Sequence, residues 1–145
     1  DIQGCFVQAH VHKMWHSEQQ LPTGDCPGVT PELDFRQARI LGMTPLDHVF
    51  TDVNGPSRSG EMVELANMSH PAVAGVLRVL ADSSFRELVL FTPPHRQALA
   101  IEPYTCAADA ANLAARGVDC GWRVLDRDAV WHSVVEYRWE DATAR

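Results

Sequence analysis

The segment FTPPHRQALAIEPYTCAADAAN spans residues 91–112 and holds Glu102, the carboxylate around which the chain is organised. The run before it, residues 98–101, is typical of a β-strand. Pro103 follows, and proline lacks the N–H that a sheet needs and biases the residue before it toward extended backbone. We therefore expect pairing to end at Pro103 and Glu102 to lie at a strand end. Such a position suits a general base, although a solvated glutamate is the more common outcome.

Short apolar or alternating runs continue on both sides of this segment. A strand expected at residues 87–92 would form a hairpin with the Glu102 strand through the turn at residues 93–95. Turns are expected at residues 21–28 and 54–57, and residues 42–54 are expected to be irregular, with Asp47 on a loop held by buried neighbours. The other expected strands include residues 4–15, 33–41, 61–67, 72–81 and 129–139.

The number and spacing of these runs indicate the fold class. Residues 107–116 have room for one short helix, which Gly117 would end. Seven or so short strands without a long helix predict an all-β, antiparallel β-sandwich. The large aromatic residues are expected to pack in its core rather than to form a sugar-stacking wall, because such side chains dominate sandwich cores. They are Phe91, Tyr104, Trp122 and Trp131.

Composition limits the classes of partner. The 145 residues are 46% hydrophobic and 21% charged, which is ordinary for one globular domain or part of one. A net charge of −7 leaves no basic patch, so we expect no binding to nucleic acid or to an anionic membrane surface. No apolar run approaches the roughly 18 residues of a membrane span. Four cysteines without a C-x-x-C pair predict reduced thiols and a cytoplasmic location, with one or two disulfides as the alternative.

One pair of histidines raises the question of a metal. His10 and His12 would face the same side of a strand, as metal ligands must. With Gly4, Glu18 and Gly24 they form G-x5-H-x-H-x5-E-x5-G, which loosely resembles the first metal motif of the cupins. The gap from His12 to Glu18 is longer than in that motif, and no second motif follows. We therefore expect no bound metal and two exposed strand histidines.

Five segments follow one another along the chain: Leu21-Pro22-Thr23-Gly24, Asp34-Phe35-Arg36, Leu46-Asp47-His48-Val49-Phe50, Glu102-Pro103-Tyr104-Thr105 and Asp109-Ala110-Ala111-Asn112. Each segment alone is a weak signal. In their order and approximate spacing, over nearly the whole chain, they resemble the aldose 1-epimerases, or galactose mutarotases. Residues 121–125 also resemble the closing segment of bacterial members.

The resemblance implies a β-sandwich of the galactose mutarotase type, a supersandwich, that interconverts the α and β anomers of a free hexose such as galactose or glucose. It implies Glu102 as the catalytic base, Asp47 as the residue that holds sugar hydroxyls, and no cofactor or metal. The chemistry fits, because opening a hemiacetal needs a base at the C1 hydroxyl and an acid at the ring oxygen. A carboxylate such as Asp47 can accept hydrogen bonds from two neighbouring hydroxyls. Without the resemblance, a turn-capping role for Asp47 is equally expected.

This sequence departs from the family in one important respect. Family members are longer, and their acid histidine lies in an upstream N-H-x-Y-F or H-P-Y-F segment that residues 1–145 lack. We therefore expect the chain to be the C-terminal part of such a domain and to have little epimerase activity alone, since a general acid contributes about 10²–10⁴ in rate. Uncovered strand edges would favour self-association. The alternative function is a non-catalytic carbohydrate-binding β-sandwich.

Overall fold

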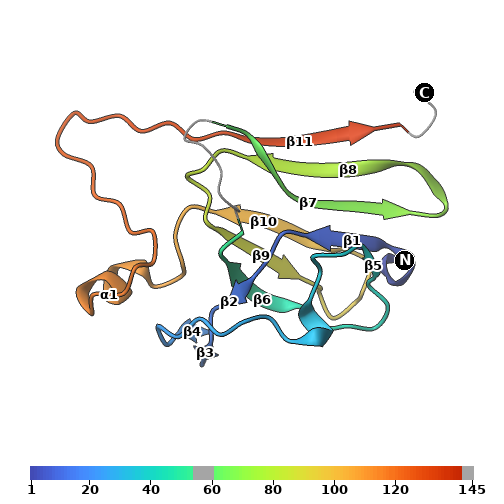
Figure 1. Ribbon diagram of the computed structural model, residues 1–145, viewed down its shortest axis with the longest axis horizontal. Coiled ribbons are helices and arrows are strands. Elements are labelled where there is room, and N and C mark those ends of the chain that lie inside the picture. Colours follow the sequence, from blue (N-terminus) through green and yellow to red (C-terminus); the bar gives the residue numbers. More distant parts are fainter. Residues whose placement is uncertain (54–60, 142–145) are drawn as a thin grey trace.

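The structure, a computed structural model, describes residues 1–53 and 61–141, in which antiparallel strands form two main sheets (Figure 1). The five-stranded sheet has the order β11-β8-β7-β1-β5, with β1 Phe6–Ala9, β5 Arg39–Ile40, β7 Val63–His70, β8 Val73–Ala81 and β11 Val135–Glu140. The four-stranded sheet has the order β10-β9-β6-β2, with β2 Lys13–Met14, β6 Asp47–Thr51, β9 Glu87–Phe91 and β10 Ala100–Tyr104. The smaller elements are β3 Ser17–Glu18, β4 Leu21–Pro22, the 3-10 helices η1 Ile2–Gly4 and η2 Pro31–Leu33, and the helix α1 Ala110–Ala115.

The main core lies between the two sheets. Side chains alternate in direction along a strand, so each sheet can turn one apolar face inward. Val7 and Val79 come from the five-stranded sheet, and Phe50, Leu88 and Leu90 from the four-stranded sheet, and none of these side chains is exposed. The structure is therefore the antiparallel β-sandwich that the sequence predicts.

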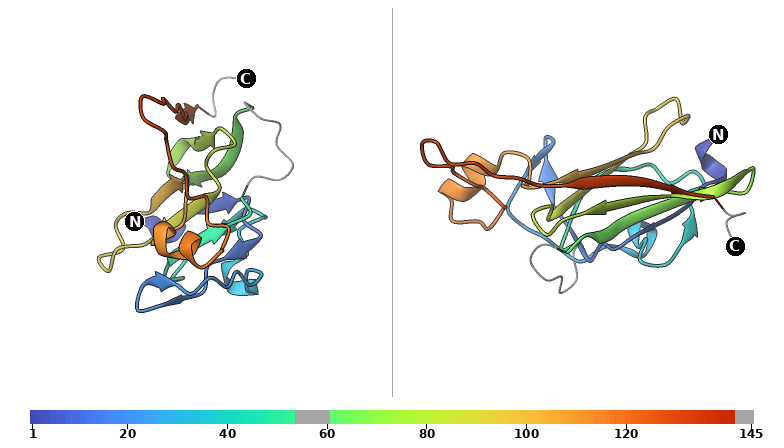
Figure 2. Two further views of the ribbon diagram at one scale, coloured as in Figure 1. Left: turned by 90° about the vertical axis from the view of Figure 1, so that its left-hand side faces the viewer. Right: turned by 90° about the horizontal axis from the view of Figure 1, so that it is seen from above.

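A second, smaller cluster covers part of the other face of the four-stranded sheet. Here Ala110 and Leu113 of α1 pack with Cys120 and Trp15. α1 lies at the end of the molecule opposite the N-terminus (Figure 2). The prediction that Gly117 ends this helix is confirmed. Gly117 has a φ of +78°, a left-handed conformation that glycine adopts without strain. No helix in residues 1–53 and 61–141 is long and apolar enough to cross a membrane.

Several expected strands are confirmed in position and pairing. The runs at residues 61–67 and 72–81 form the β7–β8 pair. The run at residues 87–92 is β9, and it forms the predicted hairpin with β10. β1 and β2 both lie within residues 4–15, whereas the final strand is shorter than expected, since β11 begins at Val135. The turn expected at residues 54–57 lies outside the described residues.

The prediction of one continuous strand over residues 33–41 is wrong. Only β5 at the end of this segment pairs with the sheet, and η2 stands at its beginning. The side chain of Asp34 accepts a hydrogen bond from the backbone N–H of Arg36 at 3.1 Å and another from its guanidinium at 2.6 Å. Such local bonds compete with strand pairing. Phe35, which is fully buried, ties the turn to the core.

The irregular structure expected over residues 42–54 is found at residues 42–46 and 52–53, but the expectation is wrong for residues 47–51. β6 lies inside the four-stranded sheet, paired with β9 on one side and β2 on the other. Asp47 is therefore the first residue of an interior strand rather than a loop residue. The run Asp47–Thr51 alternates between the two faces, and its Phe50 is buried in the main core. The sequence of this segment favours a strand only weakly, and pairing with a strand on each side compensates for that weakness.

Pro103 does not end the Glu102 strand. β10 continues to Tyr104, and Pro103 lies opposite Leu88 of β9. β10 is an edge strand among the described residues, and an edge tolerates proline because the missing N–H can face away from the sheet. Glu102 consequently lies in the middle of a paired strand and not at its end.

The prediction that four aromatic residues pack in the core is wrong as well. Tyr104 and Trp122 are exposed, and Phe91 and Trp131 are half-buried. Phe91 and Tyr104 belong to the face of the four-stranded sheet that points away from the main core. Trp122 and Trp131 lie in the extended segment between α1 and β11, where the Arg123 guanidinium stacks 4.7 Å from the centre of the Trp131 ring.

Candidate functional site

One face of the four-stranded sheet carries both carboxylates that the sequence singles out. Glu102 lies opposite Val89, which in turn lies opposite Val49, and direct partners in antiparallel strands share a face. Asp47 is two residues before Val49 on β6, so it projects from the same face. From strand spacing, the Cα atoms of Asp47 and Glu102 are about 12 Å apart. Two side chains with one sugar ring between them can span that separation.

Glu102 has an ordered hydrogen-bond partner on its own strand. The hydroxyl of Tyr104, two residues further along β10, donates to Oε2 of Glu102 at 2.9 Å. This bond to a carboxylate raises the pKa of the Tyr104 phenol, because it holds the phenolic proton in place. Glu102 is only half-buried, so its carboxylate is both oriented and accessible to a ligand.

Asp47 lines a cavity of about 370 Å³ near β2, at the opposite edge of the four-stranded sheet from β10. Trp15, His16 and Gln20 belong to its wall, and Glu102 lies outside it. Its volume is within the usual range for small-molecule sites, and the imidazole of His16 and the amide of Gln20 can exchange hydrogen bonds with hydroxyls. Burial lowers the pKa of the neighbouring His48, whose Nδ1 accepts the backbone N–H of Asp47 at 3.1 Å, so His48 favours its neutral form.

The surface between the two carboxylates is apolar. Val49, Val89 and Phe91 lie on this face, and all three are half-buried. A mostly apolar floor with a few oriented polar groups is the usual composition of a small-molecule site. The arrangement can bind a ligand that combines C–H surface with hydroxyl groups.

A buried pair that the sequence analysis missed supports this site. Nε1 of Trp15 donates to Oε2 of Glu87 at 2.9 Å, and both side chains are buried. Oε1 of Glu87 lies 3.7 Å from Nε of Arg86 and has no hydrogen-bond partner among the described residues. Burial raises the pKa of Glu87 against the opposing effect of the Trp15 bond. The sequence offered one signal for this pair, because Glu87 is the first residue of the otherwise apolar run ELVLF.

No metal site is found in the described part of the chain. No group of three or more His, Cys, Asp or Glu side chains is arranged to hold an ion there. His10 and His12 are exposed, as expected, but they follow the end of β1 at Ala9 and so do not lie on a strand.

Of three comparisons with known proteins, the one with solved structures supports the β-sandwich fold. No protein-family model matches the sequence, and no curated protein matches it. The structure is similar to the crystal structure of a galactose mutarotase-like protein from Clostridium acetobutylicum, with a TM-score of 0.80 and 20% identity. The match covers 97% of this chain and 43% of that protein, so the chain spans less than half of its length. The chain therefore has a galactose mutarotase-like β-sandwich fold.

Proposed function

We propose that this chain carries the base and part of the sugar-binding surface of an aldose 1-epimerase, which interconverts the α and β anomers of a free hexose such as galactose or glucose. The supporting observation is that Asp47 and Glu102 share one face of the four-stranded sheet across an apolar floor. The galactose mutarotase-like fold of the neighbour adds weight to the assignment.

The proposed reaction uses Glu102 as the base. Its carboxylate removes the proton from the C1 hydroxyl, the bond between C1 and the ring oxygen breaks, and an acid gives a proton to the ring oxygen. Rotation about the C1–C2 bond and the reverse proton transfers then give the other anomer. The bond from Tyr104 orients the Glu102 carboxylate, and Asp47 accepts hydrogen bonds from sugar hydroxyls, which positions the ring for the transfer.

The acid is the part of this reaction that we assign to another segment. In the family that the sequence resembles, it is a histidine upstream of the segments that this chain resembles. We therefore propose that residues 1–145 are the C-terminal part of a longer domain and that the chain alone has little epimerase activity. A missing general acid lowers the rate by about 10²–10⁴.

Sugar binding is the first test, because it does not depend on the acid. We expect galactose to shift the backbone NMR signals of β6 and β10 in the intact chain. Asp47→Asn should weaken binding by about tenfold or more, the usual effect of losing hydrogen bonds to a charged group. Glu32→Gln, a change at an exposed carboxylate on η2, is the matched control. Shifts elsewhere, or equal weakening by the control, would contradict the proposal.

Catalysis is tested by supplying the acid from solution. Polarimetry follows freshly dissolved α-galactose with imidazole buffer, with and without the chain. We expect the chain to add to the rate of imidazole alone, and Glu102→Gln to abolish that addition while leaving binding in place. Binding without any added rate would favour the non-catalytic carbohydrate-binding sandwich.

A further inference from the structure

β11 forms one edge of the five-stranded sheet. It pairs with β8 on one side, and no other strand of residues 1–53 and 61–141 pairs with it on the other (Figure 1). Its backbone N–H and C=O groups on that side can pair with another strand, which makes such an edge a site of association. On one face of the strand, Tyr137 and Trp139 are 59% and 49% exposed, far more than the core residues of β8.

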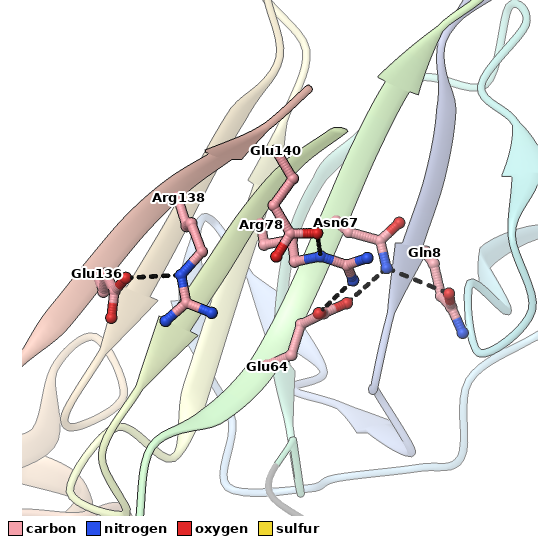
Figure 3. A network of polar contacts seen from close by, with 7 residues as sticks. All are labelled: Gln8, Glu64, Asn67, Arg78, Glu136, Arg138 and Glu140. Carbon is pink, nitrogen blue, oxygen red and sulfur yellow. Dashed lines mark hydrogen bonds and ion pairs between the residues drawn. The ribbon is translucent and has the colours of Figure 1, made fainter. Parts of the chain in front are cut away.

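The opposite face of β11 is charged. Nε of Arg138 donates to Oε1 of Glu136 at 2.8 Å, and Glu140 is bonded to Arg78 of β8 at 2.7 Å (Figure 3). The Glu136 bond uses one of the five N–H donors of the Arg138 guanidinium. Arg138 can therefore bond a second carboxylate that approaches along the edge.

The sequence of β11 is complementary to itself. Val135–Glu140 reads VEYRWE, with the aromatic Tyr137 at the centre of its first five residues. The acidic Glu136 and the basic Arg138 lie one position to either side of Tyr137. The apolar Val135 and Trp139 lie two positions to either side. An antiparallel pair with a two-fold axis at Tyr137 places Glu136 opposite the partner's Arg138. It also places Val135 opposite the partner's Trp139. Opposite charges and apolar pairs at directly facing positions both stabilise antiparallel strands.

The neighbouring registers lack this complementarity. A two-fold axis at Arg138 places Arg138 opposite the partner's Arg138 and Glu136 opposite the partner's Glu140. An axis at Glu136 places two Glu136 side chains opposite each other. Shifting by a single residue would bring the charged face of one strand beside the apolar face of the other. Like charges at directly facing positions destabilise a pair, so charge selects the register centred on Tyr137.

We propose that two copies of this chain associate through β11, antiparallel about Tyr137, so that their five-stranded sheets join into one continuous sheet. Each contact occurs twice in such a symmetric interface. One six-residue strand per copy buries little surface, so the association is weak and reversible, with dissociation in the micromolar range.

Charge reversal tests the register. Sedimentation velocity on the intact chain over a range of micromolar concentrations should show a monomer–dimer equilibrium. Glu136→Arg and Arg138→Glu each place like charges at both symmetric contacts and should weaken the dimer by about tenfold or more. The double variant restores opposite charges and should recover it. Glu32→Arg makes the same charge change on η2, away from β11, and should have no effect.

An equimolar mixture of the two single variants is the decisive measurement. Both contacts between positions 136 and 138 in the mixed dimer pair Arg with Glu, so the mixture should recover the affinity that each variant alone loses. The bond between positions 136 and 138 within one strand stays broken in both chains, so recovery reports the contacts between copies. Circular dichroism confirms that each variant is folded. A monomeric wild type, an unaffected single variant, a mixture that stays monomeric, or a dimer strengthened by Glu136→Arg would overturn the proposal.

Discussion

Replacement of Trp15 by phenylalanine tests how the candidate site is held in place. Trp15 is 4% exposed, and its Nε1 donates to Glu87, whose side chain is not exposed at all. The change removes this donor from Oε2 of Glu87, beside an Oε1 that has no hydrogen-bond partner among the described residues. An unsatisfied buried acceptor costs about 1–3 kcal/mol, and more when it is charged. With the smaller ring, we expect a total loss of about 3 kcal/mol.

A double-mutant cycle separates the hydrogen bond from the packing. Glu87→Leu alone leaves the indole N–H unpaired and should cost about 1–2 kcal/mol. The double variant removes both polar groups, and its cost should be little more than that of the smaller ring, about 1 kcal/mol, because replacing both partners by apolar groups is nearly neutral. The two single costs should therefore exceed the double cost by about 3–4 kcal/mol.

Urea unfolding of the four proteins, followed by circular dichroism, measures this difference. The pH dependence gives a second check. Because burial raises the pKa of Glu87, its contribution to stability is complete below the ordinary glutamate pKa and is lost as pH rises through the folded value. The bond from Trp15 favours the charged form, so Trp15→Phe should cost more near pH 8 than near pH 4. Additivity of the single variants within about 0.5 kcal/mol would refute the coupling.

Two further predictions concern the sheet edge and the acid limb of the stability curve. Gly75→Ala would drive a Cβ into the Trp139 ring and within 2.9 Å of the Glu140 carbonyl oxygen, so it should speed amide exchange along β11, whereas Gly28→Ala, with its nearest contact at 4.0 Å, should not. Hydrogen bonds from Arg36 lower the pKa of Asp34 from its ordinary value of 3.8 to about 2. The stability that this carboxylate contributes should therefore be complete above pH 3.8 and be lost as the pH falls toward about 2. Melting temperatures measured from pH 6 to pH 2 should show this component in the wild type and not in Asp34→Asn.

Much of the fold could be predicted from local sequence. The β7–β8 pair and the β9–β10 hairpin each join neighbours along the chain, with alternating or apolar runs and turn residues between them. The short helix and its stop at Gly117 depend on nearby residues only. These elements were found because their signals lie within a few residues of each other.

The errors occurred where distant segments decide the outcome. β6 was expected to be irregular because its strand character depends on pairing with β2 and β9, which are far away in sequence. Pro103 was expected to end β10, and whether it does depends on β10 being an edge strand. Trp15 and Glu87 are 72 positions apart, so nothing local linked them. The resemblance to the aldose 1-epimerases, rather than residue type alone, singled out Glu102 and Asp47 as candidates for sugar chemistry.

The sequence by itself determined the all-β class and the β9–β10 hairpin turn, because alternation and turn residues act over short distances. Only the tertiary structure decided that Asp47 and Glu102 share one face, that Trp15 and Glu87 support the cavity beside Asp47, and that β11 is an edge strand among the described residues. The physical reason is that strand order and register come from pairing between remote segments, and a shift of one residue would turn each side chain to the other face.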